Sequence, residues 1–213
     1  MQRLRINIRR PGRNRTTLSS SLKKRIEALY QNPPKDGRVI CLDEFGPLAI
    51  QPFPGKGWFK KEEPDRLPAT YHRYHGVRHL LAALDLKDDK LYGHTSDHKK
   101  HQDILRFLKV LRRRYHRSER LYIILDNFSP HKHTKVTTWA QENNVELVFT
   151  ATNASWMNRI ECHFGPLRKF VLSGSNYTNH TELAQAIQAH IRWRNKHKRD
   201  QRILREQKKI KVA

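Results

Sequence analysis

The chain has 213 residues, a length that suits one domain with short extensions. Its 43 Lys and Arg against 20 Asp and Glu give a formal charge of +23, which strains a compact fold unless a polyanion neutralises it. Nucleic acid is the commonest such partner, and an anionic membrane is the alternative. The sequence argues against a membrane, because no apolar run approaches the ~20 residues that span a bilayer.

The two cysteines, Cys41 and Cys162, are too few for a disulfide framework. The segment that starts at Met1 is rich in arginine and lacks the apolar stretch of a secretory signal. We therefore expect a reducing cytoplasm as the compartment. Both cysteines are interpreted as small buried residues rather than redox groups.

Three segments are predicted along the chain. Residues 1–18 form a basic arm or linker that contains Pro11 and Gly12, residues 19–197 form the folded domain, and residues 198–213 form a charged tail. Within the domain, the apolar periodicity predicts elements in this order: a helix over 19–30, a strand over 38–43, an irregular loop over 52–75, strands over 79–86 and 90–94, a helix over 99–115, a strand over 120–125, a helix over 131–144, a strand over 145–150, and helices over 155–172 and 178–197. This order favours an α/β domain with a mixed sheet.

Two aspartates directly follow apolar runs of the predicted sheet. Asp43 comes after VICL and Asp126 after LYIIL, so each is expected at the carboxyl end of a central strand, where open α/β sheets place their sites. Taken alone, either aspartate could be a turn former or a cap. Because an unpaired buried carboxylate costs several kcal/mol, a divalent cation is an attractive partner for the pair.

Glu161 is predicted to lie within the helix over 155–172. It faces away from the apolar stripe of that helix, and Asn158 shares its side. The stripe consists of Trp156, Ile160, Phe164 and Leu167. Two aspartates from strands and one glutamate from a helix can hold two Mg²⁺ ions ~3.5–4 Å apart, which is the arrangement that clamps a phosphodiester during displacement.

Several stretches of the sequence resemble the DDE transposases of the mariner superfamily, in particular the branch found in bacterial insertion sequences. The matching stretches are LDEFG at Asp43, YHRYHG with LLAALDL, LDNFSPHK at Asp126, and TNASWMNRIECHFGPL at Glu161. Asp126 and Glu161 are separated by 34 residues, the spacing of the superfamily's Asp-to-Glu variant. The resemblance covers about residues 20–197, and its last motif is the most specific.

The resemblance implies an RNase H-like fold, a mixed five-stranded sheet flanked by helices. It also implies roles for individual residues. The metal-binding and catalytic residues would be Asp43, Asp126 and Glu161, and the supporting residues would be Asn127, His131 and Asn158. Glu44 matches a recurrent Asp-Glu pair, but neighbouring strand residues point to opposite faces, so we expect it not to share the metals with Asp43.

The implied reaction is cleavage at transposon ends followed by attack of the freed 3′-OH on target DNA, with integration at TA dinucleotides. The implied cofactor is Mg²⁺, with Mn²⁺ as a substitute and two ions per site. The implied partner is double-stranded DNA, held by a homodimer near the bacterial nucleoid. Full-length members carry a helix-turn-helix portion ahead of the catalytic domain, whereas this chain begins at the linker, so a fragment, a split-gene product and a decayed copy all stay open. A non-catalytic DNA-binding remnant or regulator and a nuclease of the same fold are the alternatives.

Basic side chains near the predicted site are candidates for DNA contacts. Lys56, Lys60 and Lys61 lie in the loop over 52–75, and Arg168 and Lys169 lie two turns beyond Glu161. The neighbouring Trp58 and Phe59 either stack on an unpaired base or pin the loop to the core. Histidines spaced by three and four residues, such as those at 94, 98 and 101, permit a zinc site, but DNA backbone contact or a polar surface fits their predicted positions better.

Overall fold

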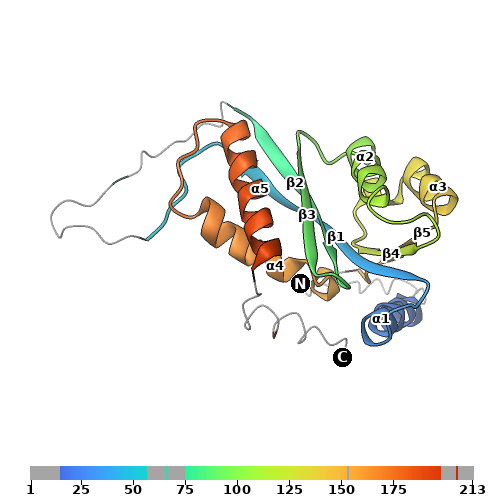
Figure 1. Cartoon of the computed structure of the whole chain (residues 1–213). Helices are drawn as coiled ribbons and strands as arrows, with labels where there is room; N and C mark the ends of the chain where they lie inside the picture. Colours follow the sequence, from blue (N-terminus) through green and yellow to red (C-terminus); the bar gives the residue numbers. More distant parts are fainter. Residues whose placement is uncertain (1–14, 57–65, 67–74, 153, 198–204, 206–213) are drawn as a thin grey trace, which may run out of the picture.

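A computed structural model describes residues 15–56, 66, 75–152, 154–197 and 205 of the chain (Figure 1). Five strands form one sheet in the order β3-β2-β1-β4-β5. The strands are β1 (Gly37–Ala49), β2 (Val77–Asp85), β3 (Lys90–Ser96), β4 (Arg120–Leu125) and β5 (Val145–Phe149). The helices are α1 (Arg15–Gln31), α2 (His101–Arg112), α3 (Thr134–Glu142), α4 (Glu161–Leu167) and α5 (His180–Lys196), with short turns η1 (Ser129–Lys132), η2 (Ser155–Met157) and η3 (Arg168–Leu172).

The sheet is mixed, as the sequence predicted. β1 pairs antiparallel with β2, and β2 with β3, whereas β1–β4 and β4–β5 are parallel. β1 is the central strand and the point at which the two pairing modes meet. It carries a near-continuous apolar run because helices cover both of its faces.

Alternate residues of β1 point into two separate hydrophobic cores. Cys41 and Phe45 pack in the core that also contains the apolar faces of α1, α4 and α5. Ile40 and Leu42 pack in the core formed with α2 and α3, which lie side by side (Figure 1). This alternation sends the side chains of neighbouring strand residues into opposite layers of the domain.

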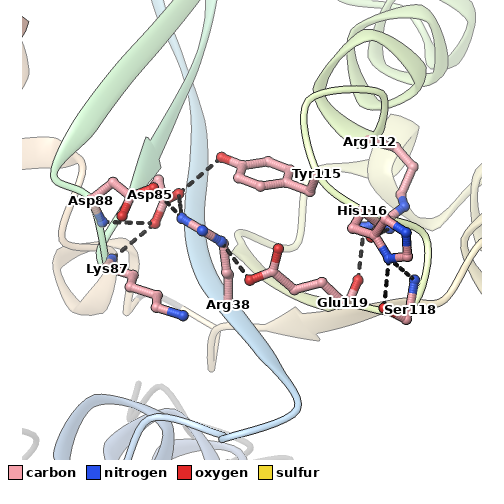
Figure 2. A network of polar contacts seen from close by, with 9 residues as sticks. All are labelled: Arg38, Asp85, Lys87, Asp88, Arg112, Tyr115, His116, Ser118 and Glu119. Carbon is pink, nitrogen blue, oxygen red and sulfur yellow. Dashed lines mark hydrogen bonds and ion pairs between the residues drawn. The ribbon is translucent and has the colours of Figure 1, made fainter.

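A buried polar network holds the end of the sheet at which β1 begins (Figure 2). Arg38 donates from Nη1 to Asp85 at 2.9 Å and from Nε to Glu119 at 2.6 Å, and Tyr115 donates to Asp85 at 3.0 Å. The network joins β1, the turn after β2 and the segment before β4. Arg38 is five residues before Asp43, or about 16 Å along the strand, so the network lies well away from the candidate site.

Several predicted helices differ from the structure at their ends, α1 and α3 among them. α1 begins at Arg15, before the expected start at residue 19. The helix expected over 131–144 is split, because His133 has extended backbone and its side chain accepts a hydrogen bond from Lys135 N to begin α3. Within the described part of the chain, no helix is long and apolar enough to cross a membrane.

Candidate active site

Asp43 and Asp126 lie where β1 and β4 separate. The parallel pairing of the two strands ends at Cys41 and Ile124, and each aspartate is two residues further along its strand. The prediction that Asp43 ends its strand was wrong, since β1 continues to Ala49 through antiparallel pairing with β2. Asp126 does follow the last residue of β4, as expected.

Glu161 is the first residue of α4, not an interior helix residue as predicted. The expected helix over 155–172 is broken at Asn158, whose backbone is extended, with φ −80° and ψ 108°. Asn158 is fully buried, and its Nδ2 donates to the backbone oxygen of Leu42 at 2.8 Å. Leu42 is the residue before Asp43 in β1. The bond therefore holds the segment before Glu161 next to Asp43. The apolar stripe holds for Ile160, Phe164 and Leu167, but Trp156 is 47% exposed.

Tyr30 supports the same segment and was missed by the sequence reasoning. Its hydroxyl donates to the backbone oxygen of Met157 at 2.9 Å, and the guanidinium carbon of Arg159 lies 3.9 Å from its ring centroid. The tyrosine lies in the last turn of α1 and is far from Met157 in the sequence. No local pattern could have revealed this contact.

Asp43, Asp126 and Glu161 influence one another through their charges. Burial raises the pKa of Asp43 to about 7, and the negative charges of Glu161, Glu44 and Asp126 add to that rise. Partial desolvation also raises the pKa of Glu161, with the charge of Asp126 adding to the rise, while a hydrogen bond with Asp43 acts in the opposite direction.

The donor set fits a hard divalent cation. Among the described residues, no group of three or more His, Cys, Asp or Glu is arranged as a preformed metal site, and this includes the three candidate acids. Burial is the main cause of the raised pKa of Asp43, and the repulsion from neighbouring acids that adds to it is the part that a bound cation would offset. Carboxylate oxygens are the ligands that Mg²⁺ prefers, so Asp43, Asp126 and Glu161 are the residues that could hold it.

Asp126 is the acid that stays charged, and His131 is the main cause. Its Oδ1 lies 3.0 Å from Nδ1 of His131 and accepts from the backbone N–H of Phe128 at 2.9 Å. The hydrogen bond from His131 lowers the pKa of Asp126. On the other side of the imidazole, Nε2 donates to Oε1 of Glu44 at 2.8 Å. Burial alone would lower the pKa of His131, but the two carboxylates raise it to about 9.

Asn127 serves a different purpose from the carboxylates. Its Nδ2 donates to the backbone oxygen of Thr150, and Thr150 N donates back to Leu125 O at 2.9 Å. These bonds join the ends of β4 and β5.

A pocket of about 380 Å³ opens beside Asp126, lined by residues 126–128 and 150–152 with Ala154 and Ser155. A larger pocket of about 630 Å³ between α2 and α3 contains none of the candidate site residues.

The structure describes only some of the basic residues that the sequence predicts as DNA contacts. Lys56 is exposed, and Lys60 and Lys61 lie outside the described residues. Arg168 is exposed with its guanidinium 5.6 Å from the ring centroid of Phe45, and Lys169 is also exposed.

Lys99 is a further basic residue at the site. Its Nζ lies 4.5 Å from the ring centroid of Phe128, and its charge helps to lower the pKa of Asp126. Lys99 could not be recognised from the sequence as a site residue, because it precedes α2 and reaches the site only through the fold.

Comparisons with known proteins identify a family and a fold for the chain. A family model described as DDE superfamily endonuclease matches residues 38–184. A crystal structure of the Mos1 strand transfer complex aligns with a TM-score of 0.65 and 15% identity, covering 99% of this chain and 63% of that chain. The catalytic domain of Mos1 mariner transposase aligns with a TM-score of 0.60 and 12% identity, covering 95% of this chain and 91% of that one. No curated protein gives a significant match to the sequence.

At these identities the structural likeness establishes the fold, and it confirms the predicted RNase H-like architecture. The chain spans 63% of the length of the Mos1 chain in the strand transfer complex. Other Mos1 structures are described as paired-end complexes with Mn or with Mg.

Proposed function

The chain belongs to the DDE superfamily endonucleases, and we propose that it is the catalytic core of a DNA transposase. In this proposal it cleaves DNA at transposon ends and joins the freed 3′-OH to target DNA, as a homodimer of the bacterial insertion-sequence branch. The observation that carries the proposal is the mutual interaction of Asp43, Asp126 and Glu161 in a chain of charge +23. The Mos1 complexes with DNA ends and with Mg or Mn support the choice of substrate and cofactor.

Three acids of this chain would hold the proposed pair of Mg²⁺ or Mn²⁺ ions: Asp43, Asp126 and Glu161. Such ions, when bound, activate the attacking oxygen and stabilise the leaving one. Asp126 is kept charged by His131 and is ready to act as a ligand. Asp43 must release its proton first, so its raised pKa makes ligand formation depend on pH around neutrality. Tyr30 at Met157 and the bond from Asn158 to Leu42 fix the chain just before α4 and so set where α4 presents Glu161.

The surrounding basic residues provide the second part of the proposal. Lys56, Lys60, Lys61, Arg168 and Lys169 would contact the DNA backbone, and such contacts position the duplex without reading its sequence. Lys99 joins this set because it lies beside Asp126. The supporting role proposed for Asn127 is to hold the β4 and β5 ends together, since its amide bonds Thr150.

A joining assay tests the proposal. The protein is incubated with a pre-cut duplex from the terminal repeat of its own element, a supercoiled plasmid, and Mg²⁺ or Mn²⁺. We expect joined product from the wild type and from Glu142→Ala, an exposed residue of α3 outside the site, and none from Asp126→Asn. DNA binding without cleavage or joining in either metal would refute the enzyme and favour the DNA-binding remnant. Cleavage without joining would favour a nuclease of the same fold.

A further inference from the structure

Glu44 is a buried acid next to the candidate site, and nothing in the proposed reaction uses it. Its side chain is 7% exposed and its carboxylate lies 2.8 Å from Nε2 of His131, which is 0% exposed. Glu44 is on the β1 face that packs against α2 and α3, whereas Asp43 is on the other face. The two adjacent acids therefore approach the site from opposite layers of the domain.

The His131 ring lies between Glu44 and Asp126 and contacts both acids. Both of its ring nitrogens face a carboxylate oxygen, so the ring is held at both ends. Within the described part of the chain, Oδ1 of Asp126 accepts a hydrogen bond from Phe128 N and lies 3.0 Å from Nδ1 of His131, which also lies 3.3 Å from the Asp126 backbone oxygen. Oδ2 is therefore the oxygen left for a further ligand, on a side chain that is 35% exposed.

We propose that Glu44 is a positioning residue that acts through His131 to hold the Asp126 carboxylate in the orientation that binds the divalent cation. The inference rests on the proposed function, since it takes Asp126 as a metal ligand. Its physical basis is that a buried imidazole without a partner at Nε2 reorients or shifts to find one. Either movement would release Oδ1 of Asp126. Outer partners of metal ligands act in this manner, and their loss commonly weakens metal binding or activity about 10–100-fold.

A purely structural role for the ion pair makes a different prediction. Buried ion pairs contribute little net stability. A gain in stability is therefore a weak explanation for burying the charged Glu44 and His131 together. If Glu44 only stabilised the fold, its replacement would lower stability and leave the metal affinity of the folded protein unchanged. If it acted only through its charge, a shorter acid would replace it well.

The test measures Mn²⁺ binding by the full chain. Electron paramagnetic resonance of the free ion reports how much Mn²⁺ stays unbound. Glu44→Gln keeps the reach of the acceptor oxygen and loses the charge, whereas Glu44→Asp keeps the charge and loses the reach. We expect Glu44→Gln to stay within about 3-fold of the wild-type affinity, and Glu44→Asp and Glu44→Ala to bind about 10-fold more weakly. Glu142→Ala is the matched control and should bind as the wild type does.

A double variant adds a second readout. Because Glu44 acts through His131 in this proposal, Glu44→Ala combined with His131→Ala should bind Mn²⁺ no more weakly than His131→Ala alone. Independent, multiplying losses would overturn the inference, and so would a Glu44→Asp variant that binds better than Glu44→Gln. Thermal unfolding identifies any variant that does not fold, and the Gln and Asp pair still decides the question if Glu44→Ala is lost.

Failure of the proposed function would look different. A wild-type chain whose Mn²⁺ binding is absent, or is unchanged in Asp126→Asn, would overturn the metal site and with it the role of Glu44. Mn²⁺ binding that requires Asp126 but ignores every Glu44 variant would overturn the role of Glu44 alone.

Discussion

Asp43→Asn should stabilise the metal-free protein, and more strongly as the pH rises. The folded state raises the pKa of Asp43 from 3.8 to about 7, so it retains a proton that the unfolded chain releases. Raising the pH from about 4 to about 7 therefore favours unfolding of the wild type. The full shift corresponds to about 4 kcal/mol, and about half of that is a realistic expectation for a partly exposed group. Asparagine does not titrate, so the variant does not lose stability in this way as the pH rises.

Urea denaturation in the presence of a chelator measures the difference. We expect the variant to be more stable than the wild type by about 2 kcal/mol at about pH 8, and by less than half as much at about pH 5. Adding Mg²⁺ at the higher pH should stabilise the wild type and leave Asp43→Asn nearly unchanged, because the ion binds only the folded chain with its ligand intact. Identical pH dependence of the two proteins would refute the electrostatic reasoning about the site.

Three further predictions concern the supporting structure and the DNA surface. Arg38→Met leaves the buried Asp85 without its cation and should cost about 3 kcal/mol in urea denaturation, yet the folded fraction should keep its metal-dependent cleavage because Arg38 lies about 16 Å from Asp43 along β1. Tyr30→Phe removes the donor to Met157 O and should lower the free energy of unfolding by about 1 kcal/mol, while a loss below about 0.3 kcal/mol would mean that the bond does not form in solution. DNA affinity should fall steeply with salt, and Arg168→Ala should reduce the slope of log affinity against log salt by about 1, whereas an unchanged slope would remove Arg168 from the interface.

Local sequence patterns determined where most strands and helices of this protein lie. A continuous apolar run is enough to place β4 and to put Asp126 directly after it, because a buried strand ends where polar residues begin. The family resemblance then selected Asp43, Asp126 and Glu161 from 20 acidic residues and supplied the RNase H-like fold, which the structure confirms.

Contacts between distant residues were decided only by the tertiary structure. Asn158 reaches Leu42 across 116 residues and breaks the helix that the apolar stripe predicted. Tyr30 reaches Met157 across 127 residues, and His131 meets Glu44 across 87. Periodicity reports which face of an element is buried, but it carries no information about which distant polar group completes a hydrogen bond there. For the same reason β1 runs past Asp43, since its later residues gain their partners from β2 and not from their own neighbours in the sequence.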